Sequence, residues 1–358
     1  MISFKVIGIE IELHWTFIAL FGYLVFSLLL FNAENFFGYL TFFVLLFLSV
    51  FFHELMHSIV ALSKKIKVQK IILLPIGGAS ITEKNIENPF DELQVAIAGP
   101  LFNFIVVIVI LFAAQMFDLG LPLSSLSEIT PESFNALLFS SPLFALLYVN
   151  LMLGLFNLLV PAFPMDGGRV LRALLSIFVG NTKATLWSTF ISKILSVAMF
   201  VFSLLIGNLI LTFISIILFV AANQEASLVK VKEEIKTVDL YDVIDFNPLK
   251  IKGTDSIEDA FKLMKSKNKT ALLVDNNKIV NLDTISKVKR DKWALPVEKI
   301  AREVPSFTLK GRKDKLVDLM LVKGIDLVPV IEKGHLVGAI EFDVLQKALE
   351  IKRILEKD

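Results

Sequence analysis

Two histidines and a glutamate stand close together in the segment His53-Glu54-Leu55-Met56-His57. On a helix, His53 and His57 project from one face about one turn apart, so their imidazole nitrogens could share one Zn²⁺. Glu54 follows the first histidine, where its carboxylate could take a proton from a zinc-activated water and pass it to a leaving amine. The segment therefore predicts zinc-dependent hydrolysis, with His53 and His57 as metal ligands and Glu54 as the catalytic base.

The alternative is a helix end at which these polar side chains meet lipid headgroups and water. The chain has only four histidines, and two of them lie here, directly after the uncharged run 35–52. An ionisable group at membrane depth costs several kcal/mol unless it is paired or metal-bound. The position of the segment therefore favours a metal site.

A third ligand has to be a histidine or a carboxylate, because the chain has no cysteine. Asp166 follows Pro161 and Pro164 and precedes Gly167-Gly168, a pattern that breaks a membrane helix and could turn a carboxylate inward. An N-cap role for Asp166 is the alternative, and the two roles are compatible. Three protein ligands would leave the fourth position of one zinc per chain open for catalysis.

Two asparagines lie deep in the uncharged runs of the chain. Asn103 and Asn157 could each donate a hydrogen bond to an oxyanion. A hydrogen bond between helices is an equally good explanation for either residue.

The elements that must position these residues are membrane helices. Of the 358 residues, 55% are hydrophobic, and the uncharged runs reach the roughly 20 residues that cross a hydrocarbon core of about 30 Å. We expect about six transmembrane helices. They lie in the runs 15–31, 35–52, 93–117, 134–165 with an irregular extension, and 184–222, where Gly207-Asn208 would separate the last two. The start of the chain has no pattern of a removable signal peptide, and the net charge of +1 gives no reason to expect a nucleic-acid partner.

The distribution of Lys and Arg predicts the orientation of these helices. The intervals 32–36, 116–140 and 207–208 contain neither residue. Basic residues fill the alternate loops, which by the positive-inside rule are cytoplasmic together with both termini and the C-terminal domain. We therefore expect a multi-pass protein of the cell membrane. The basic residues of these loops are Lys64, Lys65, Lys67, Lys70, Arg169, Arg172 and Lys183.

The sequence becomes charged after Glu225, which predicts a membrane domain over 1–225, a linker over 226–237 and a second domain over 238–358. The second domain contains a weak repeat, with copies at about 238–292 and 293–358. Each copy places a helix (256–265 or 315–322) before a strand (271–274 or 327–331), which predicts two packed α/β halves. Pro248, Met264 and Val280 recur as Pro305, Met320 and Val337.

Taken together, these motifs resemble the site-2 protease family of intramembrane zinc metalloproteases, over roughly residues 1–225. The resemblance implies that His53, His57 and Asp166 bind zinc, that Glu54 is the catalytic base, and that the site lies within the bilayer near its cytoplasmic side. It also implies transmembrane protein substrates. The matching segments are the zinc motif, Ala98-Gly99-Pro100-Leu101-Phe102-Asn103 and Pro164-Met165-Asp166-Gly167-Gly168-Arg169.

Two further segments bear on this resemblance. Pro75-Ile76-Gly77-Gly78-Ala79-Ser80 looks like the membrane-dipping hairpin of the family, and Gly77 and Gly78 could hold an unwound substrate as an added strand. Asn157 and Pro161 are one residue further apart than the family pattern, which would turn the asparagine by about 100° on a helix. The expected role of Asn157 depends on how that extra residue is absorbed.

The C-terminal repeat resembles a tandem pair of cystathionine-β-synthase-type (CBS) domains. Such pairs commonly bind adenine nucleotides through a Gly-x-x-Thr-x-x-Asp turn, and both copies here depart from that turn. Thr284 and Asp343 are the candidate nucleotide contacts, while a purely structural role or homodimer formation is the alternative. The corresponding positions are Asn281, Thr284 and Lys287 in the first copy and Gly338, Glu341 and Val344 in the second, with Asp343 displaced by one.

Two other functions are compatible with parts of the sequence. A zinc hydrolase of the same architecture could act on a lipid or a small substrate. A channel or transporter could be gated by the CBS-type pair, but the spans show no inverted repeat and have little polar lining.

Overall fold

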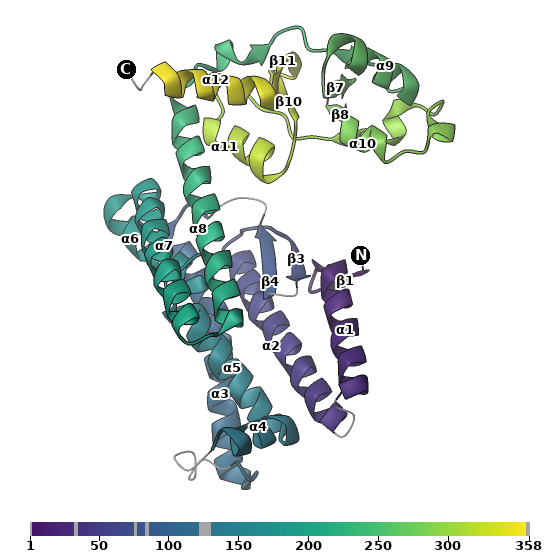
Figure 1. The fold of residues 1–358 in the computed structure, drawn as a ribbon. Coiled ribbons are helices and arrows are strands. Elements are labelled where there is room, and N and C mark those ends of the chain that lie inside the picture. Colours follow the sequence, from purple (N-terminus) through teal and green to yellow (C-terminus); the bar gives the residue numbers. More distant parts are fainter. Residues whose placement is uncertain are drawn as a thin grey trace. The chain divides into compact units, whose positions relative to one another are not determined.

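The computed structural model describes residues 2–31, 35–74, 77–82, 86–121, 130–275 and 277–355 (Figure 1). The chain forms two compact units, Met1–Ala226 and Ser227–Asp358. The first consists of apolar helices with one small sheet, and the second is an α/β unit.

Apolar helices form most of the first unit. Five described helices are long and apolar enough to cross a membrane: α2 (Phe36–Ser63), α3 (Pro89–Phe117), α5 (Pro142–Leu159), α7 (Asn181–Leu205) and α8 (Leu209–Lys236). Helix α1 (Trp15–Phe31) has 17 residues, which at 1.5 Å per residue extend about 25 Å, slightly less than the hydrocarbon core. Each of the six expected transmembrane helices thus has a helix in its place, and five of these helices have the length of a span.

The run 134–165 was expected to hold one span and an irregular extension, and it contains one further break, at Ser141. Helix α4 (Pro131–Ser140) ends before Ser141, whose hydroxyl accepts a hydrogen bond from the backbone N–H of Phe144 at the start of α5. Proline at the first position of α5 suits a helix start and disfavours helical backbone in the residue before it. The second break follows α5, and α6 (Asp166–Val179) begins after it.

The irregular segment between α5 and α6 is buried against α7. Ala162 and Phe163 are almost fully buried. The backbone N–H of Phe163 donates to the hydroxyl of Ser192, at 3.1 Å. Non-helical backbone at membrane depth is tolerated when its polar groups are satisfied within the protein in this way.

A four-stranded sheet packs against α2. Its order is β1 (Ile2–Val6), β2 (Ile9–Leu13), β3 (Val68–Leu74) and β4 (Gly77–Thr82), with β2 and β3 parallel and the other pairs antiparallel. Ile9, Ile11 and Ile71 bury their side chains with Leu55 of α2. Strands β3 and β4 border the expected hairpin 75–80, whose residues 75 and 76 lie outside the described residues. The pairing of β1 and β2 with this hairpin was not predicted.

The second unit contains the expected repeat. In the first copy α9 (Ile257–Lys267) precedes β7 (Ala271–Val274), β8 (Lys278–Asn281) and α10 (Leu282–Ser286). In the second copy α11 (Lys313–Val317) and the π-helical turn η6 (Asp318–Val322) precede β10 (Leu327–Glu332), β11 (His335–Glu341) and α12 (Phe342–Leu355). Helix and strand thus follow each other in both copies as the sequence predicted.

Two short strands exchange between the copies. The strand β5 (Ile244–Asp245) precedes the first copy's helix but pairs with β11 of the second copy. Conversely, β9 (Arg302–Glu303) pairs with β8 and completes the sheet β6 (Lys250–Ile251), β7, β8 and β9. The two halves therefore interlock, because each sheet includes a strand from the other copy.

The segment 226–237, expected as a linker, is mostly helical. Helix α8 continues to Lys236, and Ile235 is completely buried in the main core of the second unit. Lys232 pairs with Asp318 at 2.6 Å. The end of this segment therefore packs into the second unit.

Candidate metal centre

Three buried side chains from two helices converge in the first unit. His53 and His57 lie on α2, and Asp166 is the first residue of α6. The Nε2 atoms of His53 and His57 lie 3.0 and 3.1 Å from Asp166 Oδ2, and 3.1 Å from each other. A metal ion about 2 Å from each donor, the usual Zn–N and Zn–O distance, fits above such a triangle. Among the described residues, this is the one group of at least three such side chains that could hold a metal.

The hydrogen bonds of the two Nδ1 atoms determine which nitrogen of each imidazole carries the proton and which directs a lone pair into this triangle. His57 Nδ1 lies 2.6 Å from the carbonyl oxygen of Val95, which can only accept, so Nδ1 carries the proton and Nε2 keeps its lone pair. His53 Nδ1 lies 2.5 Å from Asn103 Oδ1, in an equivalent arrangement. Two lone pairs and a carboxylate oxygen repel one another at such distances unless a cation lies between them. The donor set therefore fits zinc, whose protein ligands are neutral imidazoles and carboxylates.

Gly99 of α3 makes room for this group of ligands. A Cβ atom at this position would lie 2.3 Å from His57 Nε2 and 2.7 Å from His53 Nε2. Both distances are well inside van der Waals contact. Only glycine leaves enough space for both imidazoles at position 99 of the Ala98-Gly99-Pro100 segment. The sequence indicated this position only through the family motif.

Glu54 lies between α2 and the outer strand β4. A Cβ atom at Gly78 would lie 2.2 Å from Glu54 Cγ and 2.9 Å from its Cδ, so the strand backbone touches this side chain. The hydroxyls of Ser58 and Ser80 lie 2.9 Å apart and join the same two elements. Gly77 begins the strand with a φ of 139°, which favours glycine. The structure therefore brings Gly78 of β4 next to Glu54.

The two asparagine candidates occupy different environments. Asn103 is completely buried. Its Oδ1 atom accepts a hydrogen bond from Nδ1 of His53, and its Nδ2 atom donates to Asn150 Oδ1 at 2.8 Å. Asn157 is half-buried near the end of α5, and its side chain has no hydrogen-bond partner among the residues that the structure describes. Asn150 was missed by the sequence reasoning, although an asparagine within an uncharged run was a usable signal.

The structure also bears on the alternative cap role of Asp166, and it places two further side chains of ligand type, His14 and Asp91, outside the triangle. Met165, and not Asp166, occupies the cap position of α6. The Nδ1 atom of His14 lies 2.6 Å from Thr16 Oγ1, and Asp91 pairs with Lys64 at 3.6 Å.

Arg172 joins the segment before Asp166 to two other helices. Its guanidinium donates to the buried carboxylate of Glu92 on α3 and to Glu225 on α8, each at 2.7 Å. It also lies over the ring of Phe163, 5.3 Å from the ring centre. Arg172 therefore joins several helices within the first unit. The count of basic residues above had placed it among the charges of a loop.

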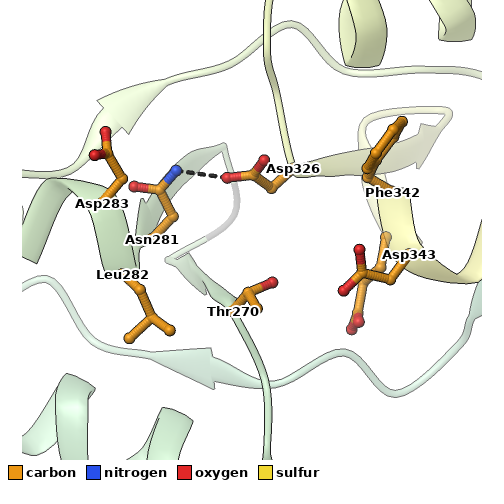
Figure 2. A pocket seen from close by; sticks show the side chains of 8 residues that line it. Thr270, Asn281, Leu282, Asp283, Asp326, Phe342 and Asp343 are labelled. Carbon is orange, nitrogen blue, oxygen red and sulfur yellow. Dashed lines mark hydrogen bonds between the residues drawn. The ribbon is translucent and has the colours of Figure 1, made fainter.

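The second unit contains a cavity of about 220 Å³, with side chains from both copies around it (Figure 2). Asp343 lines this cavity, whereas Thr284 does not and donates its hydroxyl to Asn281 at 2.6 Å. Asn281 donates in turn to Asp326 at 2.5 Å. The lining carries four carboxylates, and its residues are Thr270, Asn281, Leu282, Asp283, Asp326, Glu341, Phe342 and Asp343.

Comparison with known proteins identifies the family. The chain is 37% identical to a zinc metalloprotease of Methanocaldococcus jannaschii over 358 residues, which make up 99% of this chain and 97% of that protein. The chain belongs to peptidase family M50. Residues 41–206 match the profile of family M50, and residues 240–282 match that of the CBS domain.

Two further relatives of this family M50 protein cover less of the chain. Stage IV sporulation protein FB of Bacillus subtilis is 33% identical over 130 residues, which are 36% of this chain and 38% of that protein. A solved site-2 protease from Methanocaldococcus jannaschii is 43% identical and covers 63% of this chain and 94% of that chain, with a TM-score of 0.47.

The family membership confirms the main predictions from the sequence. The protein is a zinc metalloprotease of the site-2 protease type, with several membrane helices followed by a CBS-like α/β region. Zinc is the metal implied by this family, and His53, His57 and Asp166 are the described residues that could hold it. Membership of a peptidase family favours the protease over the alternative of a gated channel or transporter.

Proposed function

We propose that this protease hydrolyses peptide bonds of transmembrane protein substrates within the bilayer. In this proposal His53, His57 and Asp166 bind one zinc ion and Glu54 is the catalytic base. The main support is the triangle of three buried donor atoms, 3.0 to 3.1 Å apart, in a unit built from membrane-length helices. Ligands this deep in apolar helices would be costly without a metal.

The residues around the triangle have distinct tasks in the reaction. Bound zinc would supply a Lewis acid for the scissile carbonyl and for a water. Glu54 would take a proton from this water and transfer it to the leaving amine, because it follows His53 on α2 and faces β4. We retain Asn157 as the candidate oxyanion donor, since Asn103 is committed to His53 and Asn150.

We further propose that the substrate binds as an extended strand beside β4. This strand is the outermost of its sheet, so its outer edge can pair with an added backbone. Gly77 and Gly78 offer no side chains that would hinder this approach, and Gly78 contacts Glu54. Recognition through backbone hydrogen bonds would require the substrate helix to unwind locally.

The test uses the full-length protein reconstituted with a single-span membrane peptide. Glu54→Gln should lower the cleavage rate by about 10² to 10⁴-fold, the usual contribution of a general base, while about one zinc per chain remains bound. His53→Ala and Asp166→Ala should lose zinc as well as activity. Persistent cleavage in Glu54→Gln, or full zinc content in His53→Ala, would refute the assignment. Cleavage of a lipid ester but of no peptide would instead favour the lipid-hydrolase alternative.

We also propose that the basic loops, both termini and the CBS-like region face the cytoplasm. The absence of native cysteine permits a direct test with single cysteines introduced as Leu119→Cys and Lys183→Cys. In intact cells, a membrane-impermeant thiol reagent should label the first variant and spare the second. The reverse labelling pattern would refute this orientation.

We propose that the CBS-like pair regulates the protease by binding a ligand or by forming a homodimer. An adenine nucleotide is one candidate ligand for the cavity in Figure 2, with Asp343 at its wall. The carboxylates of Asp283, Asp326 and Glu341 would repel phosphate groups, although Lys269 neutralises Glu341 at 2.6 Å. Adenosine should therefore bind at least as tightly as ATP in calorimetric titrations, and tighter binding of ATP would contradict this reasoning. Homodimer formation can be measured by analytical ultracentrifugation in detergent.

A further inference from the structure

A buried chain of polar groups extends behind His53, on the side opposite the metal centre. Asn103 Nδ2 donates to Asn150 Oδ1 at 2.8 Å, and Asn150 Nδ2 donates to the carbonyl of Leu146 at 2.9 Å and to Ser49 Oγ at 3.0 Å. The three side chains come from α3, α5 and α2, and none is more than 4% exposed. We call these four groups the amide chain.

The direction of the amide chain is fixed at its far end. The carbonyl of Leu146 can only accept a hydrogen bond, so Asn150 must turn its NH₂ group toward it. If Asn150 were turned over, two oxygen atoms would face each other at hydrogen-bond distance. Asn150 therefore presents its oxygen to Asn103, and Asn103 must present its own oxygen to His53.

This direction determines the tautomer of His53. The oxygen of Asn103, 2.5 Å from Nδ1, requires a proton on that nitrogen. The Nε2 atom then keeps its lone pair, which faces Asp166 and His57. A histidine ligand is commonly held by an acceptor on its outer nitrogen, and here that acceptor is itself oriented by a second residue.

We infer that Asn150 is a positioning residue for His53, acting through Asn103. It touches neither the metal centre nor His53. Asn150 fixes the amide of Asn103 in the one orientation that leaves His53 ready to bind a metal. This inference rests on the proposed metal site, and its primary measurement is zinc affinity and not proteolysis.

Zinc affinity of the full-length protein, measured by competition with a chelator, tests the inference. Asn103→Leu should weaken zinc binding by about 10 to 100-fold, the usual effect of losing an outer-shell partner. Asn150→Leu should weaken it by about 10-fold, because Asn103 then loses its orientation. The double variant should bind zinc no more weakly than Asn103→Leu alone. Additive effects of the two changes would overturn the inference.

The four histidines of the chain also permit a spectroscopic test on zinc-loaded protein carrying [¹⁵N]histidine. In Asn150→Leu, the Nδ1–H proton of His53 should shift and exchange faster with water. The Nδ1–H of His57, bonded to Val95, should not change and serves as the internal control. An unchanged His53 signal would overturn the inference.

Asn150→Asp separates positioning from simple packing. A protonated carboxyl group at this position can donate to the carbonyl of Leu146 and still accept from Asn103, so zinc affinity should stay closer to the native value than in Asn150→Leu. A packing role predicts the opposite order, because a buried carboxylate is costlier than an apolar side chain. Thr185→Val is the control for loss of a buried polar group, since this hydroxyl bonds the carbonyl of Asn181 on its own helix. Its zinc affinity should equal that of the native protein.

These measurements distinguish the inference from the proposed function. Native zinc affinity in Asn150→Leu would refute the inference alone. If the native protein binds zinc, His53→Ala loses it, and yet no peptide is cleaved, only the proposed function is refuted.

Discussion

Replacing Gly99 by alanine would add one methyl group between α3 and the two imidazoles. This methyl would lie 2.3 Å from His57 Nε2 and 2.7 Å from His53 Nε2, whereas non-bonded heavy atoms normally stay about 3.5 Å apart. The His57 ring would have to move by about 1 Å to restore normal contact. It cannot rotate away freely, because its Nδ1 is bonded to the backbone of Val95.

A displacement of this size exceeds what a zinc site tolerates. Coordination distances in proteins stay within about 0.2 Å of their usual values. Gly99→Ala should therefore lose most of its zinc and, with it, the proteolytic activity. The helix itself should not suffer, since alanine is favoured over glycine in a helix by about 1 kcal/mol.

Three measurements on the purified variant test this expectation. They are zinc content, circular dichroism and cleavage of a membrane peptide. Gly22→Ala is a matched control, because this glycine also lies in an apolar helix and has no described atom within 4 Å of the added methyl. The control should keep its zinc. A Gly99→Ala protein with native zinc content and activity would refute the reasoning.

Three further predictions follow from neighbouring contacts. Gly78→Ala should lower the cleavage rate by about 10²-fold while zinc stays bound, because its methyl would displace Glu54; zinc content and rate separate the two effects. Arg172→Met should lower the free energy of unfolding by about 3 to 5 kcal/mol, since it leaves the buried Glu92 without its partner; denaturant unfolding in detergent measures this loss. Removal of zinc with a chelator should abolish cleavage and lower the melting temperature, and added Zn²⁺ should restore both, because a ligand at about 1,000 times its Kd stabilises by about 4 kcal/mol.

The parts of the molecule that depend on local pattern could be predicted from the sequence. Uncharged runs located the membrane helices, and the spacing of His53 and His57 indicated a shared metal. Pro161 and Pro164 indicated the break that brings Asp166 to the two histidines. The roles of these residues in catalysis stay predictions until the variants are measured.

The features that escaped prediction depend on contacts between distant segments. In the parallel pairing of β2 with β3, Glu10 lies opposite Lys70, although α1 and α2 separate the two strands in the sequence. No local sequence pattern encodes this pairing. Asn103 and Asn150 are polar residues in apolar runs, and only the fold shows that they are joined behind His53. Ser141-Pro142 was a readable signal for a helix start, and the expectation of one span over 134–165 did not use it.

The exchanged strands of the second unit have a consequence for biosynthesis. A ribosome that has released residues 238–292 has delivered a first sheet without its fourth strand, because β9 is supplied by residues 302–303. The strand β5, already made, must wait for β11 at residues 335–341. The first sheet can close only after residues 302–303 have emerged, and the second only after residues 335–341.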